Sequence, residues 1–167
     1  VITRSVKVRN EGNEEIYLTK VMSMSMDMDN DDYEMITLHG SWARERQIDV
    51  RGIGYGKQSV ASNRGESSHQ EHPFMAVKKT ATNNSGEVYG AAFIYSGNFI
   101  SQVERCQMDT LRLSMGINPE GFKWKLDSEE EFVSPEVVLT YSYNGIGQMS
   151  RNFHDLFRNH LIRSKYN

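Results

Sequence analysis

The chain of 167 residues is 38% hydrophobic and 25% charged, a balance typical of a folded globular domain and not of a disordered segment. Its formal net charge of −3 excludes the strong positive field that attracts nucleic acids or anionic lipids. No apolar run approaches the roughly 20 residues that a membrane-spanning helix needs. The single cysteine, Cys106, excludes an internal disulfide and favours a reducing compartment, so we expect a cytoplasmic protein.

Apolar and polar residues alternate along most of the chain, which is the pattern of half-buried β-strands. The alternation is already present at residue 2, so we expect the chain to be a piece of a longer protein. The alternating segments lie at residues 2–8, 16–28, 33–38, 42–50, 74–79, 88–97, 98–104, 110–117, 122–126 and 132–143. Short turns rich in Asn and Gly separate them, which predicts an all-β fold, an antiparallel β-sandwich (supersandwich).

The period of the pattern changes after Asn144-Gly145. Apolar residues then recur at spacings of three and four: Met149, Phe153, Leu156, Phe157 and Leu161. This spacing predicts one C-terminal amphipathic α-helix of roughly five turns. We therefore expect residues 1–144 to form the sandwich and residues 145–167 to form a helix that lies on it or leads to a further domain.

Residues 51–72 contain four glycines and several serines without sustained alternation. We expect a long loop here. Loops longer than about 15 residues inside compact domains are usually functional or disordered. The segment is therefore a candidate contact surface between domains or subunits, with a disordered surface loop as the alternative.

The segment VMSMSMDMDNDDYE, residues 21–34, raises the question of a metal site. Its acids match the start of a calcium-binding loop: Asp27, Asp29 and Asp31. The match fails at Asp32 and Leu38, where such a loop requires Gly and Glu. The thioethers of its four methionines, Met22, Met24, Met26 and Met28, could suit a soft metal. No His or Cys lies nearby to complete such a site. The alternation instead predicts one face of a strand, so we expect the methionines to pack.

Two histidines, His69 and His72, are three residues apart, a spacing that can bind zinc on a helix. Pro73 follows at once and no third ligand is apparent, so we expect loop histidines. Ser67 and Ser68 precede His69, but adjacency in sequence does not make a nucleophile and its base.

The charged runs at residues 44–46 (Arg-Glu-Arg) and 129–131 (Glu-Glu-Glu) are typical of solvated surface. Trp42 and Trp124 could stack on a sugar ring, although such tryptophans more often belong to a core. The residues taken by themselves therefore nominate no catalytic, cofactor-binding or metal-binding side chain.

Several segments of the chain, in order, resemble the N-terminal β-sandwich region of bacterial α-galactosidases (melibiases) of glycoside hydrolase family 36. They are VITRSVKVRNEG at the start, LHGSWARER (38–46), SNRGESSHQEHPF (62–74), GEVYGAAFIYSGNF (86–99), INPEGFKWKL (117–126) and SPEVVLTYSYNGIGQMSRNFHDLFRNHL (134–161). The last is the most specific, because it joins a strand, a turn and a helix. Relatives often have VDFPDADYD where this chain has MDMDNDDYE (26–34).

The resemblance implies that further sandwich strands precede this segment and that a catalytic (β/α)₈ barrel follows it. It implies a homo-oligomeric parent that hydrolyses terminal α-galactosides, such as melibiose and raffinose, with retention of configuration. One carboxylate of the barrel would act as nucleophile and another as acid and base. The present residues would then carry neither role, would be inactive alone, and would serve to pack on the barrel and in oligomer assembly.

Two other functions stay open. The chain could be a free-standing carbohydrate-binding module, with Trp42, Trp124 or the tyrosines at 141 and 143 as its stacking platform. It could also be a purely structural assembly domain without sugar contact.

Overall fold

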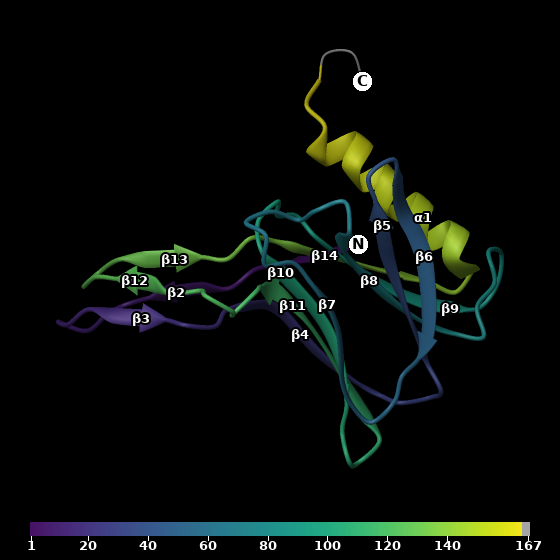
Figure 1. Cartoon of the computed structure of the whole chain (residues 1–167), viewed down its shortest axis with the longest axis horizontal. Coiled ribbons are helices and arrows are strands. Elements are labelled where there is room, and N and C mark those ends of the chain that lie inside the picture. Colours follow the sequence, from purple (N-terminus) through teal and green to yellow (C-terminus); the bar gives the residue numbers. More distant parts are fainter. Residues whose placement is uncertain (165–167) are drawn as a thin grey trace.

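The computed structural model describes residues 1–164 and confirms an antiparallel β-sandwich with one C-terminal α-helix (Figure 1). The first sheet has six strands in the order β1 (Ile2–Arg4), β14 (Val137–Ser142), β9 (Glu87–Phe93), β8 (Glu71–Lys79), β5 (Glu34–Ser41) and β6 (Arg44–Gly52). The second has four in the order β4 (Met22–Asp29), β11 (Thr110–Ile117), β10 (Phe99–Arg105) and β7 (Gly56–Ala61). Every pair of neighbouring strands within these two sheets is antiparallel.

The two sheets bury one apolar core between their facing sides. Met35, Met75 and Val77 fill it from the six-stranded sheet, and Phe99 and Leu111 fill it from the four-stranded sheet; all five side chains are fully buried. Because successive side chains of a strand point to opposite faces, these residues alternate with residues that leave the core. This alternation is the reason that the sequence pattern predicts the sandwich.

The methionine-rich segment forms β4, and three of its four methionines face the sandwich core. Met24 is buried, and Met26 and Met28 pack against the core from partly buried positions. Met22 belongs to neither apolar cluster of the structure. The predicted packing role is therefore confirmed for three residues, and the prediction that all four share one face is wrong at Met22.

A β-bulge explains the exception. Met24 lies opposite Met115, whereas Met22 lies opposite Gly116, which leaves Ser23 as an extra residue in β4. A Cβ at position 116 would lie only 2.8 Å from the Cα of Met22, so the close approach of the two strands requires glycine. The bulge shifts the alternation by one residue and buries Ser23.

A slender arm projects from one end of the sandwich (Figure 1). It consists of two strand pairs, β2 (Lys7–Arg9) with β13 (Glu131–Val133) and β3 (Ile16–Leu18) with β12 (Trp124–Leu126). The strands predicted at residues 2–8, 16–28 and 132–143 are therefore each divided into an arm strand and a sandwich strand. Apolar alternation continues across these divisions, so it does not mark them.

Residues 51–72 are not one long loop, which corrects the prediction. β6 extends to Gly52, β7 occupies Gly56–Ala61 at the edge of the four-stranded sheet, and β8 begins at Glu71. Only residues 62–70 form a long connection. The alternation is hard to see in β7 because Val60 is its only fully buried residue.

Helix α1 (Gly145–Leu156) lies on the outer face of the six-stranded sheet against β9 and β14, and a π-helical turn (Phe157–Leu161) continues it (Figure 1). Met149 and Phe153 are buried in a second apolar cluster between helix and sheet, and Leu156 and Phe157 pack against it. This confirms the predicted apolar stripe as far as residue 157. Leu161 at the end of the helix is exposed.

The start of α1 is bonded to the turn at residues 82–86. Three consecutive N–H groups donate to carbonyl oxygens of this turn: Gly145 to Gly86, Ile146 to Thr82 and Gly147 to Asn83, at 2.9–3.0 Å. These carbonyls satisfy donors that a side-chain cap would otherwise serve, and Asn144 makes no such cap. A Cβ at position 147 would lie 2.8 Å from the Asn83 oxygen, so this contact requires glycine.

Candidate functional site

Two of the acids at residues 27–31 form ion pairs with residues of other strands. The Arg112 guanidinium donates to both oxygens of Asp27 at 2.7 Å, and the Lys79 ammonium donates to Asp31. The hydrogen bond from Arg112 lowers the pKa of Asp27 below its usual value. Within residues 1–164, no group of three or more His, Cys, Asp or Glu side chains has the arrangement of a metal site.

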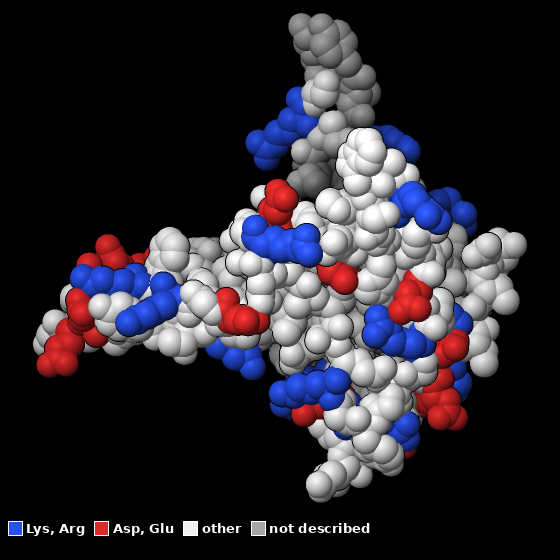
Figure 2. Space-filling model, viewed as in Figure 1, with Lys and Arg blue, Asp and Glu red and all other residues white. Residues whose placement is uncertain are grey.

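The charged runs also pair locally. Glu129 accepts from Arg9 and Glu131 pairs with Lys7, both at 2.6 Å, on the exposed surface of the arm. Figure 2 shows basic and acidic side chains interspersed over the visible face of the molecule, including the arm. This face presents no field of a single sign that would select a polyanion.

The predicted pair His69 and His72 is not brought together as a ligand set. His69 is exposed in the connection before β8, and His72 is half-buried within β8, on a strand and not on a helix. Burial lowers the pKa of His72, and the nearby charge of Arg46 lowers it further. Ser67 and Ser68 serve the backbone of the same connection: the Ser67 N–H donates to the Ser96 carbonyl, and the Ser68 Oγ accepts from an amide N–H.

A different histidine, His39 of β5, has the most polar contacts. Its Nδ1 lies 2.7 Å from the Glu71 carboxylate and its Nε2 lies 2.6 Å from the Thr37 hydroxyl. Arg51 and Asp49 of β6 complete this group, with Arg51 Nε 3.0 Å from the Asp49 carboxylate. Sequence reasoning missed the group, because only strand register places β5, β6 and β8 side by side. The group lines neither of the two clefts described below. Its side chains come from β5, β6 and β8, so its contacts link these three strands.

The aromatic residues considered as sugar platforms lie in separate places. Trp42 is 83% exposed in the turn between β5 and β6, and Trp124 belongs to the arm, where its ring lies 5.3 Å from that of Phe132. Tyr141 lies at the end of β14 beside Tyr89, at 4.9 Å between ring centroids. The structure therefore does not join the two tryptophans into one binding surface.

Two clefts flank α1. The first, which we call the β6 cleft, has a volume of about 510 Å³ and lies between the helix and strands β5 and β6. Its wall is mainly apolar and includes Leu38, Ile48, Phe74, Ile146, Phe153 and Phe157, with Arg46 and His72 also lining it. Ile48 is 70% exposed, an unusual state for a large apolar side chain beside other apolar groups. This cleft is suited to packing against another protein surface.

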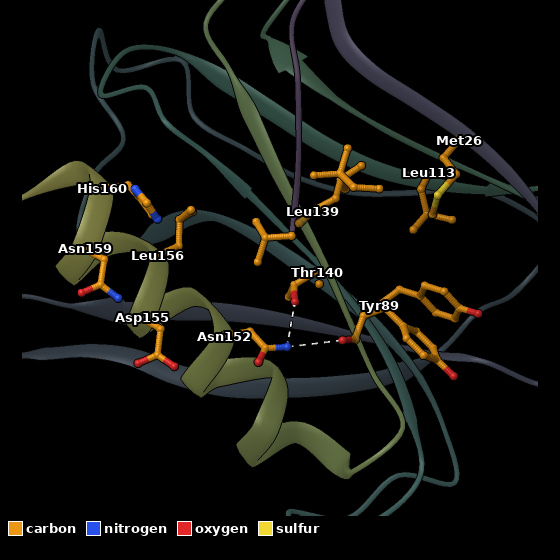
Figure 3. Close-up of a pocket in the computed structure, with 15 residues that line it drawn as sticks. Met26, Tyr89, Leu113, Leu139, Thr140, Asn152, Asp155, Leu156, Asn159 and His160 are labelled. Atoms are coloured by element: carbon orange, nitrogen blue, oxygen red, sulfur yellow. Dashed lines mark hydrogen bonds between the residues drawn. The ribbon is translucent and has the colours of Figure 1, made fainter.

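The second, the β14 cleft, has a volume of about 740 Å³ and lies between α1, its π-helical turn and the end of the sheet at β1 and β14 (Figure 3). Its sandwich side is apolar, with Met26, Leu113 and Leu139. Its helix side is mostly polar and carries Asn152, Asp155, Asn159 and His160 beside the apolar Leu156. The Asn152 amide points to β14 and donates to the Thr140 hydroxyl at 3.0 Å and to the Tyr141 carbonyl at 3.3 Å (Figure 3).

Comparison with known protein families gives two adjoining matches. Residues 1–127 match the glycosyl hydrolase family 36 N-terminal domain, and residues 131–167 match the melibiase model. The chain belongs to glycosyl hydrolase family 36. The two matches confirm the resemblance that was found in the sequence of this family 36 chain. The second match begins at β13 and includes β14 and α1.

Relatives of this family 36 chain are α-galactosidases. It is 48% identical over 167 residues to α-galactosidase AgaA of Geobacillus stearothermophilus and to α-galactosidase Mel36A of Lactobacillus acidophilus, with 99% of this chain aligned in each case. A crystal structure of an AgaA variant in complex with stachyose superposes with a TM-score of 0.96 over 98% of the chain at 47% identity. The galactosidase domain of the α-galactosidase-sucrose kinase AgaSK also reaches 0.96, at 38% identity.

The aligned part is a small share of these relatives. The chain spans 23% of the length of AgaA and of Mel36A. Within residues 1–164, no helix combines the length and apolar character needed to cross a lipid bilayer.

Proposed function

We propose that the chain is the non-catalytic β-sandwich of an α-galactosidase that hydrolyses terminal α-galactosides of the melibiose and raffinose type. The identity to AgaA and Mel36A along 99% of the chain supports this activity for the full-length protein. Structures of AgaA variants in complex with raffinose and stachyose support the substrate class. The catalytic carboxylates of the retaining mechanism would then lie in a (β/α)₈ barrel outside the present residues.

In this proposal the sandwich packs on the barrel through the β6 cleft. The observation that carries it is the exposed apolar wall of this cleft, above all Ile48. The cleft is bounded by α1, which is held at its start by three backbone hydrogen bonds to the turn at residues 82–86. We propose a division at residue 144, with residues 145–167 as the connection to the barrel, which is helical from Gly145 to Leu161.

Substitution of Ile48 tests the packing role. Ile48→Lys introduces a charge at a position that is exposed in the 167-residue chain, so we expect its Tm to change little. In the full-length enzyme the same lysine would be buried against the barrel without a partner, so we expect a clear loss of Tm and of kcat/KM for a chromogenic α-galactoside. Differential scanning fluorimetry and initial rates measure both effects.

The matched control is Met108→Lys in the turn between β10 and β11. Met108 is 89% exposed and lies outside both clefts. We expect this variant to leave both the chain and the full-length enzyme unchanged. Equal, small effects of Ile48→Lys in the two proteins would argue against docking at the β6 cleft.

We further propose that the full-length enzyme is a homo-oligomer of the cytoplasm. The free Cys106 supports a reducing compartment, and the long connection at residues 62–70, with exposed Asn63, Arg64 and Glu66, supports a subunit contact. Light scattering of the full-length enzyme measures its assembly. A purely structural assembly domain without sugar contact would also promote oligomer formation.

A free-standing carbohydrate-binding module is the alternative function. One observation favours it: Tyr141, which is 49% exposed, lines the β14 cleft together with the amide of Asn152 and the carboxylate of Asp155. The Tyr141 ring packs beside Tyr89 on the core-facing side of β14, and Asn152 approaches Thr140 from the other side, so the cleft would offer a sugar an aromatic wall and a separate polar wall. Calorimetric titration with galactose, melibiose and raffinose separates the two functions, because saturable binding at millimolar or tighter affinity would favour the module.

A further inference from the structure

The start of α1 contains the only Asn-Gly pair of the sequence, Asn144-Gly145. In an unfolded chain such a pair deamidates spontaneously, because glycine has no Cβ to obstruct attack by its backbone nitrogen on the preceding side-chain amide. Asn144 is exposed, whereas Gly145 is buried. Solvent therefore reaches the amide that would react, and the fold controls the nitrogen that would attack it.

Deamidation of this pair is a cyclisation followed by hydrolysis. The Gly145 nitrogen loses its proton and bonds to Cγ of Asn144, the Cγ–Nδ2 bond breaks, and ammonia leaves with that proton. Water then opens the resulting succinimide. Cleavage of the bond between the nitrogen and Cγ gives aspartate. Cleavage of the bond between the nitrogen and the backbone carbonyl carbon gives isoaspartate, in which the main chain runs through the side chain.

Two features of the folded chain oppose the cyclisation. The Gly145 N–H donates to the Gly86 carbonyl at 2.9 Å, so the proton that must leave is held in a backbone hydrogen bond. The planar five-membered ring also requires the Gly145 nitrogen and the Asn144 Cβ to eclipse each other about the Cα–C bond. At the observed ψ of 34° for Asn144, these two atoms lie on nearly opposite sides of that bond.

The turn at residues 82–86 opposes the rotation that the ring requires. A Cβ at position 145 would lie 2.5 Å from the Thr82 carbonyl oxygen, so backbone atoms of the turn enclose Gly145 closely. The next two N–H groups of the helix donate to carbonyls of the same turn. Rotation about the Cα–C bond of Asn144 would displace all three donors, so it requires the helix and the turn to separate.

We propose that Asn144 is a latent deamidation site, which the contact between α1 and the turn at residues 82–86 keeps unreactive. The inference concerns the chemical stability of the chain and does not depend on α-galactosidase activity. It makes the amount of product at Asn144 a record of how often this contact has opened.

The two products differ in their effect on the contact. Aspartate leaves the main chain unchanged and places a negative charge at the N-terminus of α1, where the helix dipole favours it. Isoaspartate adds a methylene group to the main chain directly before Gly145, which moves the three N–H groups away from their acceptors. Formation of isoaspartate would therefore release the start of the helix from the turn.

Peptide mapping of the full-length protein tests the protection. During incubation at mildly alkaline pH, below the Tm, we expect deamidation at Asn144 to be at least about tenfold slower than in a synthetic peptide of residues 137–152, because only the peptide samples the ring geometry freely. Electron-transfer fragmentation distinguishes aspartate from isoaspartate at this position. Equal rates in the protein and the peptide would overturn the proposal.

A glycine variant of the full-length protein tests the role of the turn. Gly147→Ala adds a Cβ against the Asn83 carbonyl oxygen, so we expect it to weaken the contact and to accelerate deamidation at Asn144 about threefold or more. Gly52→Ala adds the same group in open space of β6 and should leave the rate unchanged. An unchanged rate in folded Gly147→Ala would refute the protective role of the turn. The comparison with the peptide uses no variant, so it still tests the proposal if Gly147→Ala does not fold.

Hydrogen exchange tests the effect of the products. Protein that is aged in urea and refolded contains both forms, which chromatography separates. We expect the amides of residues 145–147 to exchange faster in the isoaspartate form than in Asn144→Asp, which has the unaltered main chain. The same exchange rates in both would show that isoaspartate does not release the helix.

Discussion

At the residue scale, Gly147 shows how a short contact decides a residue type. Glycine inside a helix usually costs about 1 kcal/mol relative to alanine, so helix propensity alone favours Gly147→Ala. The structure predicts the opposite, because the added Cβ would lie 2.8 Å from the Asn83 carbonyl oxygen, a backbone atom. We expect a loss of about 1–3 kcal/mol in the free energy of unfolding, measured by urea denaturation.

Gly52→Ala is the control for this substitution. Gly52 lies in β6 with open space where a Cβ would be added. We expect no loss of stability at this position. If Gly147→Ala proved as stable as the natural chain, the close contact between helix and turn would be wrong.

His72 predicts a pH dependence of stability. Burial and the charge of Arg46 lower its pKa in the folded chain below the usual value of about 6.5. The unfolded chain therefore binds a proton more readily, so the contribution of neutral His72 is complete above pH 6.5 and is lost as the pH falls through and below that value. We expect His72→Gln to reduce the drop in Tm between pH 7.5 and pH 5.5, as thermal melts would show. An identical drop in variant and natural chain would contradict it.

The sequence predicts which face of its own strand a side chain lies on better than it predicts contacts between side chains of different strands. The inward positions of Met24, Met26 and Met28 follow from alternation within β4. The contact between His39 and Glu71 depends on the pairing of β5 with β8, which no local pattern encodes. The departure at Met22 depends on Gly116 of the neighbouring strand, which is equally remote in sequence.

At the scale of elements, α1 is held to the sheet by its apolar stripe. Phe153 is buried against β9, and its ring lies 6.0 Å from that of Phe74 in an edge-to-face arrangement. We expect Phe153→Ala to lower the free energy of unfolding by about 3–5 kcal/mol. His154→Ala, at the exposed neighbouring position, should stay within about 0.5 kcal/mol of the natural chain. Similar losses for both variants in guanidinium titrations would show that the helix is not anchored by this face.

The same scale shows where sequence patterns lose information. The strands with a clear apolar face, such as β11, are predictable almost residue by residue. β7 is not, because an edge strand with one exposed face needs few apolar residues. The arm is not predictable as a separate part of the fold, because its strands carry the same alternation as the sandwich strands that they continue.

At the scale of the whole molecule, the chain has an extensive scaffold and no described cluster of catalytic groups. Its two clefts are lined mainly by apolar, amide and imidazole side chains, and Asp155 is the only carboxylate in their described linings. A retaining glycosidase needs two carboxyl groups about 5–5.5 Å apart. We therefore expect the purified 167-residue chain to release no nitrophenol from p-nitrophenyl α-galactoside, with the full-length enzyme as positive control. Turnover that exceeds a mock purification and persists through further chromatography would refute this.

The bonding of residues 145–147 to the turn at 82–86 makes the start of α1 a fixed joint instead of a hinge. A rotation of the helix about this joint would break three hydrogen bonds together and lift Met149 and Phe153 from the sheet. A torque applied to the helix is therefore transmitted to β9 at the centre of the six-stranded sheet. The orientation of any domain attached to the end of the helix would therefore be set by a turn some sixty residues earlier in the chain.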